Sequence, residues 1–333
     1  MVEVVVALTP PLSPKSQDKP TNVVMITDPG LDLDDEMAAV LVRFLVELNL
    51  VKLLGVVCNL HPSFDRARLM RGTLDLLGLQ EVPVGVGTDG GSVINQDTFS
   101  ETASDFMPVP GEKRSLSMPT GQEVLLETFT KAEPKSISLC LISSLKDAAL
   151  FMRTHCELFV AKVASVTIMG GCQPLDDASS QQAQAEQRTD VGGAGLPAAR
   201  SHQQQYFVPD TANNNTFDME AAQFLMQALQ QHGVPTHVVS RFAAYACAID
   251  RSLYDELASN GHPIGRRLRD VQRQTITELW DRACSPPGSP ARMSLPNRCD
   301  RKWFLDTFCD RLDPMYCKDG DPIWFHIKSF NMY

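Results

Sequence analysis

The sequence predicts an α/β fold in which a mainly parallel open sheet is covered by helices on both faces. From residue 22 onward, short unbroken runs of Val, Ile and Leu alternate with longer amphipathic stretches. Unbroken apolar strands are typical of parallel sheets buried on both faces, and the stretches between them are long enough to form crossover helices. In such sheets, ligands bind at the carboxyl ends of the strands. We therefore expect the functional residues directly after the strands.

The strand candidates are short aliphatic runs at 22–27, 52–58, 82–87, 136–142, 165–170 and 236–240. The helix candidates are 34–48, 63–77, 121–131, 145–153, 219–231 and 264–282. The first helix carries apolar residues at the spacing of one helical face, namely Met37, Ala38, Leu41, Phe44, Leu45 and Leu48. Ser63 is placed to cap the second helix. Asp28, Asn59, the 143–146 loop and Gly170–Gly171 each follow a strand, so we expect them on one common rim.

Composition and charge narrow the class of partner. The chain has 333 residues with 30 basic and 40 acidic side chains, a net charge of −10, and no basic block. This balance gives no support to binding of nucleic acid or of anionic membranes. The nine cysteines form no C-x-x-C pair and several lie in apolar runs, which is typical of a reduced protein. No apolar stretch reaches the ~20 residues that span a bilayer, so we expect a cytoplasmic protein.

We expect a flexible tail at 1–20 followed by a single domain at 21–333. Within the domain, 88–118 is polar and loop-like, and 284–298 is a Pro/Ser-rich connector. The segment 176–205 is rich in Gln, Ala and Gly, which predicts a mobile insertion.

The segment TDPGLDLDDEMAAV (27–40) is the most informative in the chain. Asp28, Asp32, Asp34 and Asp35 lie within eight positions around a Pro-Gly turn, between a strand and a helix. Like charges this close repel one another unless a cation offsets them, and carboxylate oxygens suit Ca²⁺ or Mg²⁺. Helix capping is the alternative, but it explains one or two of the acids rather than four.

This segment resembles the opening motif of the inosine–uridine-preferring nucleoside hydrolase family, in which Asp-Pro-Gly ends a strand and Asp-Asp starts a helix. The resemblance implies a calcium ion held by Asp28 and Asp35, with Asp28 also the general base and Asp34 the ribose contact. The spacing here is two residues longer than usual, which indicates a divergent branch. It leaves Asp32 as a rival for either role.

Further segments match the family in order. The loop after 52–58 implies that Asn59 contacts the sugar. ISSLKDAA (142–149) resembles the loop whose backbone carbonyl, here near Lys146, completes the calcium shell. VTIMGG (166–171) resembles a Met-Gly-Gly strand end. VPDTANNNTFDMEAA (208–222) implies a ribose-binding amide at Asn214, with Asn213 as a neighbouring candidate, while an Asn-rich turn before a capped helix is the alternative.

Two departures bear on activity. Ala212 stands where many members have a Glu that contacts the sugar, and the family's late metal ligand, an Asp usually followed by Pro, has no clear counterpart before Tyr333. A shortened chain is the favoured explanation, and the alternatives are substitution by Asp300 or an incomplete metal shell.

His61 is a candidate leaving-group acid or a surface residue. Trp303, Phe304, Phe308, Trp324 and Phe325 form either an aromatic wall for a base or the packing of late helices.

The resemblance therefore implies hydrolysis of the N-glycosidic bond of small-molecule ribonucleosides to ribose and free base, as in purine or pyrimidine salvage. It also implies a homo-oligomer. The first rival is a binding or scaffold protein that kept the fold and lost turnover. The second is a Mg²⁺ phosphohydrolase, which would need a phosphate-binding Gly-rich loop or a basic residue near the acids.

Overall fold

The computed structural model describes residues 19–30, 33–91, 118–175, 206–293, 298–309 and 323–331. The expected mobile insertion at 176–205, all but two residues of the expected tail at 1–20, and Asp32 lie outside these ranges. No helix in the described ranges is both long and apolar enough to cross a membrane.

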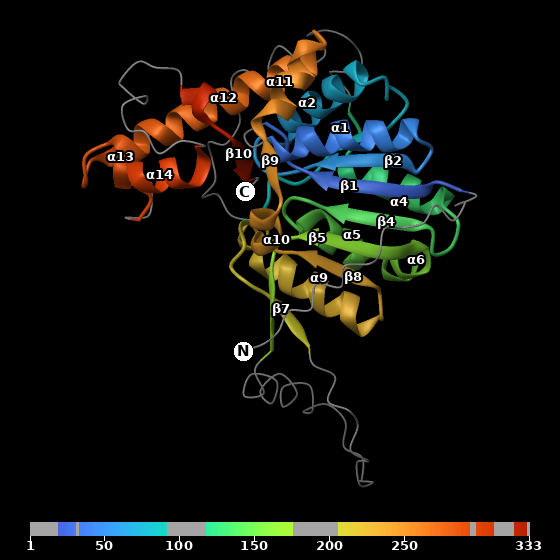
Figure 1. The fold of residues 1–333 in the computed structure, drawn as a ribbon. Coiled ribbons are helices and arrows are strands. Elements are labelled where there is room, and N and C mark those ends of the chain that lie inside the picture. Colours follow the sequence, from blue (N-terminus) through green and yellow to red (C-terminus); the bar gives the residue numbers. More distant parts are fainter. Residues whose placement is uncertain are drawn as a thin grey trace.

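A parallel sheet of six strands forms the centre of the fold, with the order β3-β2-β1-β4-β5-β8 (Figure 1). The strands are β1 (Thr21–Thr27), β2 (Val51–Cys58), β3 (Val84–Val86), β4 (Ile137–Leu141), β5 (Val163–Met169) and β8 (Thr236–Val239). All six agree with the sequence-based prediction to within a few residues. Their unbroken apolar runs form parallel strands because both faces of the sheet are covered by helices.

Alternate residues of each strand point to opposite faces, so the sheet divides two apolar cores. On one face, Met25 and Val56 pack against α1 (Asp34–Glu47) and α2 (Ser63–Leu76). On the other face, Val24 and Val57 pack against a second set of helices. These are α4 (Gly121–Lys131), α5 (Lys146–Thr154), α6 (Cys156–Lys162) and α9 (Met219–Gln231). The predicted α/β fold, with helices on both faces of a parallel sheet, is confirmed.

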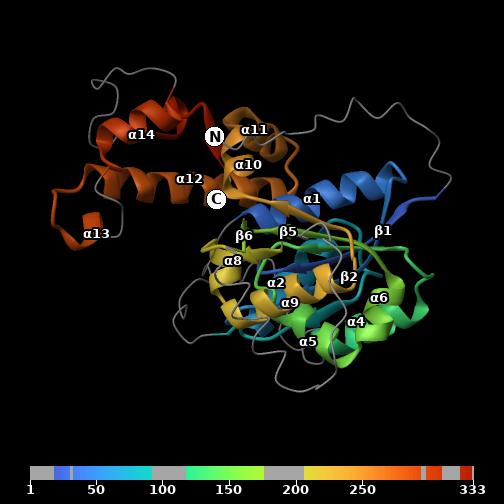
Figure 2. The ribbon, with the colours of Figure 1, turned by 90° about the horizontal axis from the view of Figure 1, so that it is seen from below.

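A helical lobe lies beside the sheet and has a core of its own (Figures 1 and 2). It contains α11 (Arg251–Ser259), α12 (Pro263–Cys284), α13 (Pro290–Met293), α14 (Arg301–Phe308) and the 3-10 helix η2 (Ile323–His326). Two short strands, β9 (Ala248–Asp250) and β10 (Ser329–Asn331), pair in antiparallel fashion at its base. Leu33, Met37 and Val40 of the α1 region pack into this lobe, so α1 contacts both parts of the molecule.

The remaining described elements are short: β6 (Cys172–Pro174), β7 (Phe207–Pro209), α8 (Asn213–Thr216) and α10 (Arg241–Ala246). β6 and β7 form a two-stranded antiparallel sheet. One expected cap is wrong, because α2 has Pro62 at its N-cap position and Ser63 is its first helical residue. The Ser63 backbone amide instead donates to the Asp89 carboxylate.

Candidate functional site

The sheet reverses its direction of growth between β1 and β4, and this switch point defines the candidate site. From β1 the chain builds outward through β2 to β3, and the later strands β4, β5 and β8 extend the other edge. The helices that follow β1 and β4 therefore leave toward opposite faces, which opens a crevice at the carboxyl ends of these strands. Asp28 follows β1, and the loop 142–145 follows β4.

The Asp28–Gly30 turn is fixed by a glycine and by a buried arginine. Gly30 has φ 127°, a conformation that side-chain-bearing residues rarely adopt. Arg66 of α2 is 1% exposed. Its Nη1 donates to the carbonyl of Asp28 at 2.5 Å and to that of Pro29 at 2.9 Å. Its Nε and Nη2 both donate to the carbonyl of His61, at 3.2 and 3.1 Å. One guanidinium thus holds the turn against the loop after β2.

Asp35 is the buried acid of the cluster, with 2% of its surface exposed. Its Oδ1 accepts a hydrogen bond from the Thr27 hydroxyl and another from the Asp28 backbone amide at 3.2 Å. Burial, and then the charges of Asp28 and Asp34, raise the pKa of Asp35 well above its usual value, although the Thr27 hydrogen bond opposes this shift. A cation beside Asp35 would remove much of this penalty, because it would offset both the burial and the repulsion.

The oxygen donors of this cluster fit a hard cation such as Ca²⁺, which prefers carboxylate and carbonyl ligands. Asp28 and Asp35 are the two carboxylates that would hold it. Within the described ranges, however, no group of three or more His, Cys, Asp or Glu side chains has the geometry of a metal site. Asp32 lies outside those ranges, so its rivalry with Asp34 and Asp35 stays a prediction.

A buried ion pair connects the cluster to the helical lobe. Glu36 follows Asp35 directly and is 0% exposed, and its Oε1 accepts from Arg267 of α12 at 2.9 Å. Burial raises the pKa of Glu36, and the charge of Arg267 partly offsets this. Tyr254 of α11 is also buried, and its desolvation together with the charge of Asp34 raises its pKa to about 12. The lobe therefore contacts the helix that carries the acids.

Asn59 is at the centre of a buried polar network on the rim. Its Nδ2 donates to the carbonyl of Ser144 and to Asp147 Oδ2, both at 3.0 Å, and its Oδ1 accepts from the Ser143 hydroxyl. Asp147 also accepts from the backbone and side chain of Thr88. Both Nδ2 hydrogens of Asn59 are thus used within the protein. The role of Asn59 as a sugar contact stays a prediction, and this network positions the loop after β4.

The Asn-rich loop lies across the ends of β4 and β5. Asn214 Nδ2 donates to the carbonyls of Ile142 (3.2 Å) and Met169 (2.9 Å), so it joins the two strand ends. Asn213 is exposed. Asn215 is completely buried, and its Nδ2 donates to the Gly171 carbonyl at 2.9 Å. The structure thus places Asn214 at the ends of β4 and β5, and the roles of Asn214 and Asn213 as ribose contacts stay predictions.

Lys146 is the first residue of α5, so its carbonyl belongs to the hydrogen-bonding pattern of that helix. Its Nζ forms an ion pair with Asp218 at 3.2 Å and donates to the Gly90 carbonyl at 3.1 Å. The backbone carbonyls nearest the end of β4 are those of Ile142, Ser143 and Ser144. The Ile142 and Ser144 carbonyls accept hydrogen bonds from Asn214 and Asn59. The calcium contact expected near Lys146 stays a prediction.

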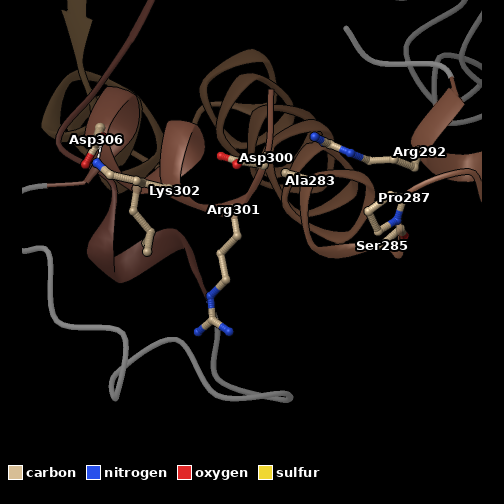
Figure 3. A pocket seen from close by; sticks show the side chains of 9 residues that line it. Ala283, Ser285, Pro287, Arg292, Asp300, Arg301, Lys302 and Asp306 are labelled. Carbon is tan, nitrogen blue, oxygen red and sulfur yellow. Dashed lines mark hydrogen bonds and ion pairs between the residues drawn. The ribbon is translucent and has the colours of Figure 1, made fainter. Parts of the chain in front are cut away.

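Asp300 is not brought to the acid cluster. It caps α14 by accepting from the Trp303 backbone amide at 2.8 Å, and α14 lies at the outer end of the lobe in both views (Figures 1 and 2). It lines a cavity of about 760 Å³ between the ends of α12 and α14, with Arg292, Arg301, Lys302 and Asp306 (Figure 3). This cavity is remote from β1 and β4, so we do not assign the reaction to it. The structure does not bring Asp300 to Asp28 and Asp35, and its role as a substitute metal ligand stays a prediction.

The late aromatic residues pack the lobe. Phe304, Phe308 and Trp324 are buried in its core, whereas Phe325 is 65% exposed. These positions favour the packing of the late helices over an aromatic wall for a base.

Several residues of the site were not anticipated from the sequence. Arg66, Glu36, Asp147 and Arg267 are charged side chains with less than a tenth of their surface exposed. Charged residues are seldom buried without a partner, but a sequence pattern cannot tell which ones they are. The sequence offers one indication that Glu36 is buried: it directly follows two acids on a helix whose next residues are apolar.

Comparisons with known proteins were made by sequence and by structure. No protein-family model matches the chain, and no curated protein matches it by sequence. The fold is similar to the type III effector protein XopQ, solved in complex with adenosine diphosphate ribose, at 26% identity and TM-score 0.75, over 95% of this chain and 79% of that one. It is equally similar to the effector protein XOO4466, at 26% identity and TM-score 0.74, over 95% and 78%.

A purine-preferring ribonucleoside hydrolase from Gardnerella vaginalis is a more distant match, at 14% identity and TM-score 0.50, over 75% of this chain and 70% of that one. At this identity, the likeness concerns the fold alone. The chain therefore has an α/β fold that it shares with the two effector proteins and, more distantly, with a ribonucleoside hydrolase.

Proposed function

We propose that this chain hydrolyses the N-glycosidic bond of a ribonucleoside with a water activated at a calcium site formed by Asp28 and Asp35. The observation that carries the proposal is the state of Asp35, a buried carboxyl group beside Asp28 and Asp34 at the switch point of the sheet. A buried acid with acidic neighbours is costly unless a cation is present. The fold shared with a ribonucleoside hydrolase supports the same proposal.

In this mechanism, calcium would supply a positively charged centre that orients a water and the ribose hydroxyls. Asp28 accepts a proton from the water as its oxygen bonds to the anomeric carbon. The C–N bond breaks, the bonding electrons leave with the base, and the departing base takes up a proton from solvent, which balances the proton that the attacking water gives to Asp28. Asp34 accepts hydrogen bonds from the ribose hydroxyls, and the carboxylates stabilise the developing positive charge on the sugar. Asn59, Asn213 and Asn214 remain the candidate amide contacts to the sugar.

A second candidate is binding of a ribose-containing ligand without cleavage. Both Nδ2 hydrogens of Asn59 and of Asn214 are used in bonds within the protein. Fewer amide donors are therefore available to a sugar than the sequence suggests. The similar effector XopQ was solved with adenosine diphosphate ribose, which contains two ribose units joined by a diphosphate.

The deciding experiment measures base release from inosine, uridine and adenosine, and adenosine diphosphate ribose binding by calorimetry, with calcium and then with a chelator. The variant Asp28→Asn is compared with Asp250→Asn, which removes one charge from an exposed helix cap remote in sequence from the cluster. Calcium-dependent release that is lost only in Asp28→Asn supports the hydrolase. Ligand binding with no release supports the second candidate, and neither activity in any condition refutes both.

A further inference from the structure

A cavity of about 760 Å³ lies between the end of α12 and the start of α14, in the helical lobe (Figure 3). Part of its wall is apolar, because Ala283, Pro287 and Leu305 line it, and Ala283 and Leu305 are only 4% and 6% exposed. Pockets for small molecules enclose roughly 300–1,000 Å³ and combine apolar walls with a few polar groups. The size of the cavity and this part of its wall suit the apolar body of a small organic molecule.

The charged residues that line the cavity leave one positive charge in excess. Arg292, Arg301 and Lys302 lie around it together with Asp300 and Asp306. Lys302 Nζ and Asp306 Oδ2 form an ion pair at 2.5 Å, so these two charges compensate each other. Two guanidinium groups then remain against the single carboxylate of Asp300, which caps α14. In a chain whose net charge is −10, this local excess favours a negatively charged ligand.

Both guanidinium groups are held in place by the lobe. Arg292 is 7% exposed, and its Nη1 donates to the carbonyl of Cys299. Arg301 is exposed, and its guanidinium carbon lies 5.3 Å from the centre of the Trp280 ring. In Figure 3 the Arg301 side chain extends away from Asp300. A guanidinium that is already packed loses little conformational freedom when it binds an anion, and its planar fork matches a carboxylate.

We propose that this cavity binds a small organic anion, with a carboxylate head and an apolar body. The body packs against Ala283, Pro287 and Leu305, and the head contacts Arg301. Arg301 and Leu305 are four positions apart, so they lie on the same face of α14 and one ligand contacts both. A bare anion uses only the charge, and a neutral apolar molecule uses only the walls. A ligand that carries both parts is therefore expected to bind more tightly than either.

The test compares three probes by saturation-transfer NMR titration, namely octanoate, 1-octanol and acetate. Octanoate has both parts, 1-octanol has the same body without the charge, and acetate has the same head without the body. Octanoate is expected to bind saturably and roughly fivefold more tightly than 1-octanol, which is the upper range for one partly exposed ion pair. Acetate is expected to show no saturation in the same range. A chelator is present throughout, so the result does not depend on calcium or on base release.

Two variants locate the binding. Arg301→Gln removes the charge at a similar length and is expected to abolish the advantage of octanoate while leaving 1-octanol unchanged. Ser285→Phe places a ring in the cavity, since Ser285 lines it, and is expected to weaken both probes. Arg266→Gln is the matched control, because Arg266 is exposed on α12 and is not among the residues that line the cavity.

Unchanged circular dichroism and thermal unfolding show that each variant folds, and Arg301→Gln alters only an exposed side chain. The absence of saturable octanoate binding to the wild-type chain overturns the proposal. So does binding of 1-octanol or acetate as tight as that of octanoate, or an equal effect of Arg301→Gln and Arg266→Gln.

Discussion

Replacing Arg66 with lysine tests whether the Arg66 guanidinium fixes the Asp28–Gly30 turn. The guanidinium makes four hydrogen bonds to the carbonyls of Asp28, Pro29 and His61, whereas a lysine ammonium cannot reproduce the planar fork. If two of the four bonds are lost, at about 1.5–3 kcal/mol for each hydrogen bond to a charged group, the free energy of unfolding falls by roughly 3 kcal/mol or more. Urea denaturation without calcium measures this loss.

Arg71 of the same helix supplies a matched control. It is also buried, and its guanidinium donates to the carbonyls of Val82 and Leu79 and to the Asp75 carboxylate, none of which belongs to the Asp28–Asp35 cluster. Arg71→Lys is therefore expected to lower stability by a similar amount.

Only Arg66→Lys should also weaken calcium binding measured by calorimetry, by about tenfold or ~1.4 kcal/mol, because only that variant frees the Asp28 backbone. Equal calcium affinities in the two variants would refute the idea that Arg66 positions the turn.

Three other outcomes follow from the site. When folding raises the pKa of a carboxyl group, the free energy of unfolding falls as the pH rises from about 4 to the raised pKa. Asp35→Asn should therefore stabilise the calcium-free protein at pH 7 in thermal unfolding and remove any stabilisation by calcium. Glu36→Gln or Arg267→Met should each cost about 3–5 kcal/mol by breaking a buried pair, and the double variant Glu36→Leu/Arg267→Met should recover much of this loss in urea denaturation. Asp300→Asn should retain wild-type calcium affinity by calorimetry, since Asp300 caps α14, and a tenfold loss would restore it as a ligand.

The fold was predictable because its signals are local. An aliphatic run such as 22–27 forms a strand when helices cover both of its faces. The Asp-Pro-Gly sequence that follows it specifies a turn. The position of Asp28 and Asp35 near the end of β1 follows from the same local pattern. The sequence order of strands also limits the sheet to a few arrangements.

The buried partners were not predictable, since they depend on contacts between distant segments. Asn59 was expected to face a ligand, but its amide contacts a loop 85 residues later in the chain. Likewise the period of apolar residues in α1 does not distinguish a face packed on the sheet from one left at the surface. Leu41 and Val42 differ by one position, and only the tertiary structure assigns them to opposite sides.

The Glu36–Arg267 pair has a consequence for how the protein is made. The two residues are 231 positions apart, so at roughly 5–20 residues per second a ribosome needs about 10–50 s between them. During that interval Glu36 lacks its hydrogen-bonded partner, and Arg66 is the basic residue already synthesised whose charge lowers the pKa of Glu36. We therefore expect Glu36 to stay either hydrated or protonated until α12 leaves the exit tunnel. The ion pair that joins the acidic helix to the lobe is then formed late, although the site's own residues are among the first to be synthesised.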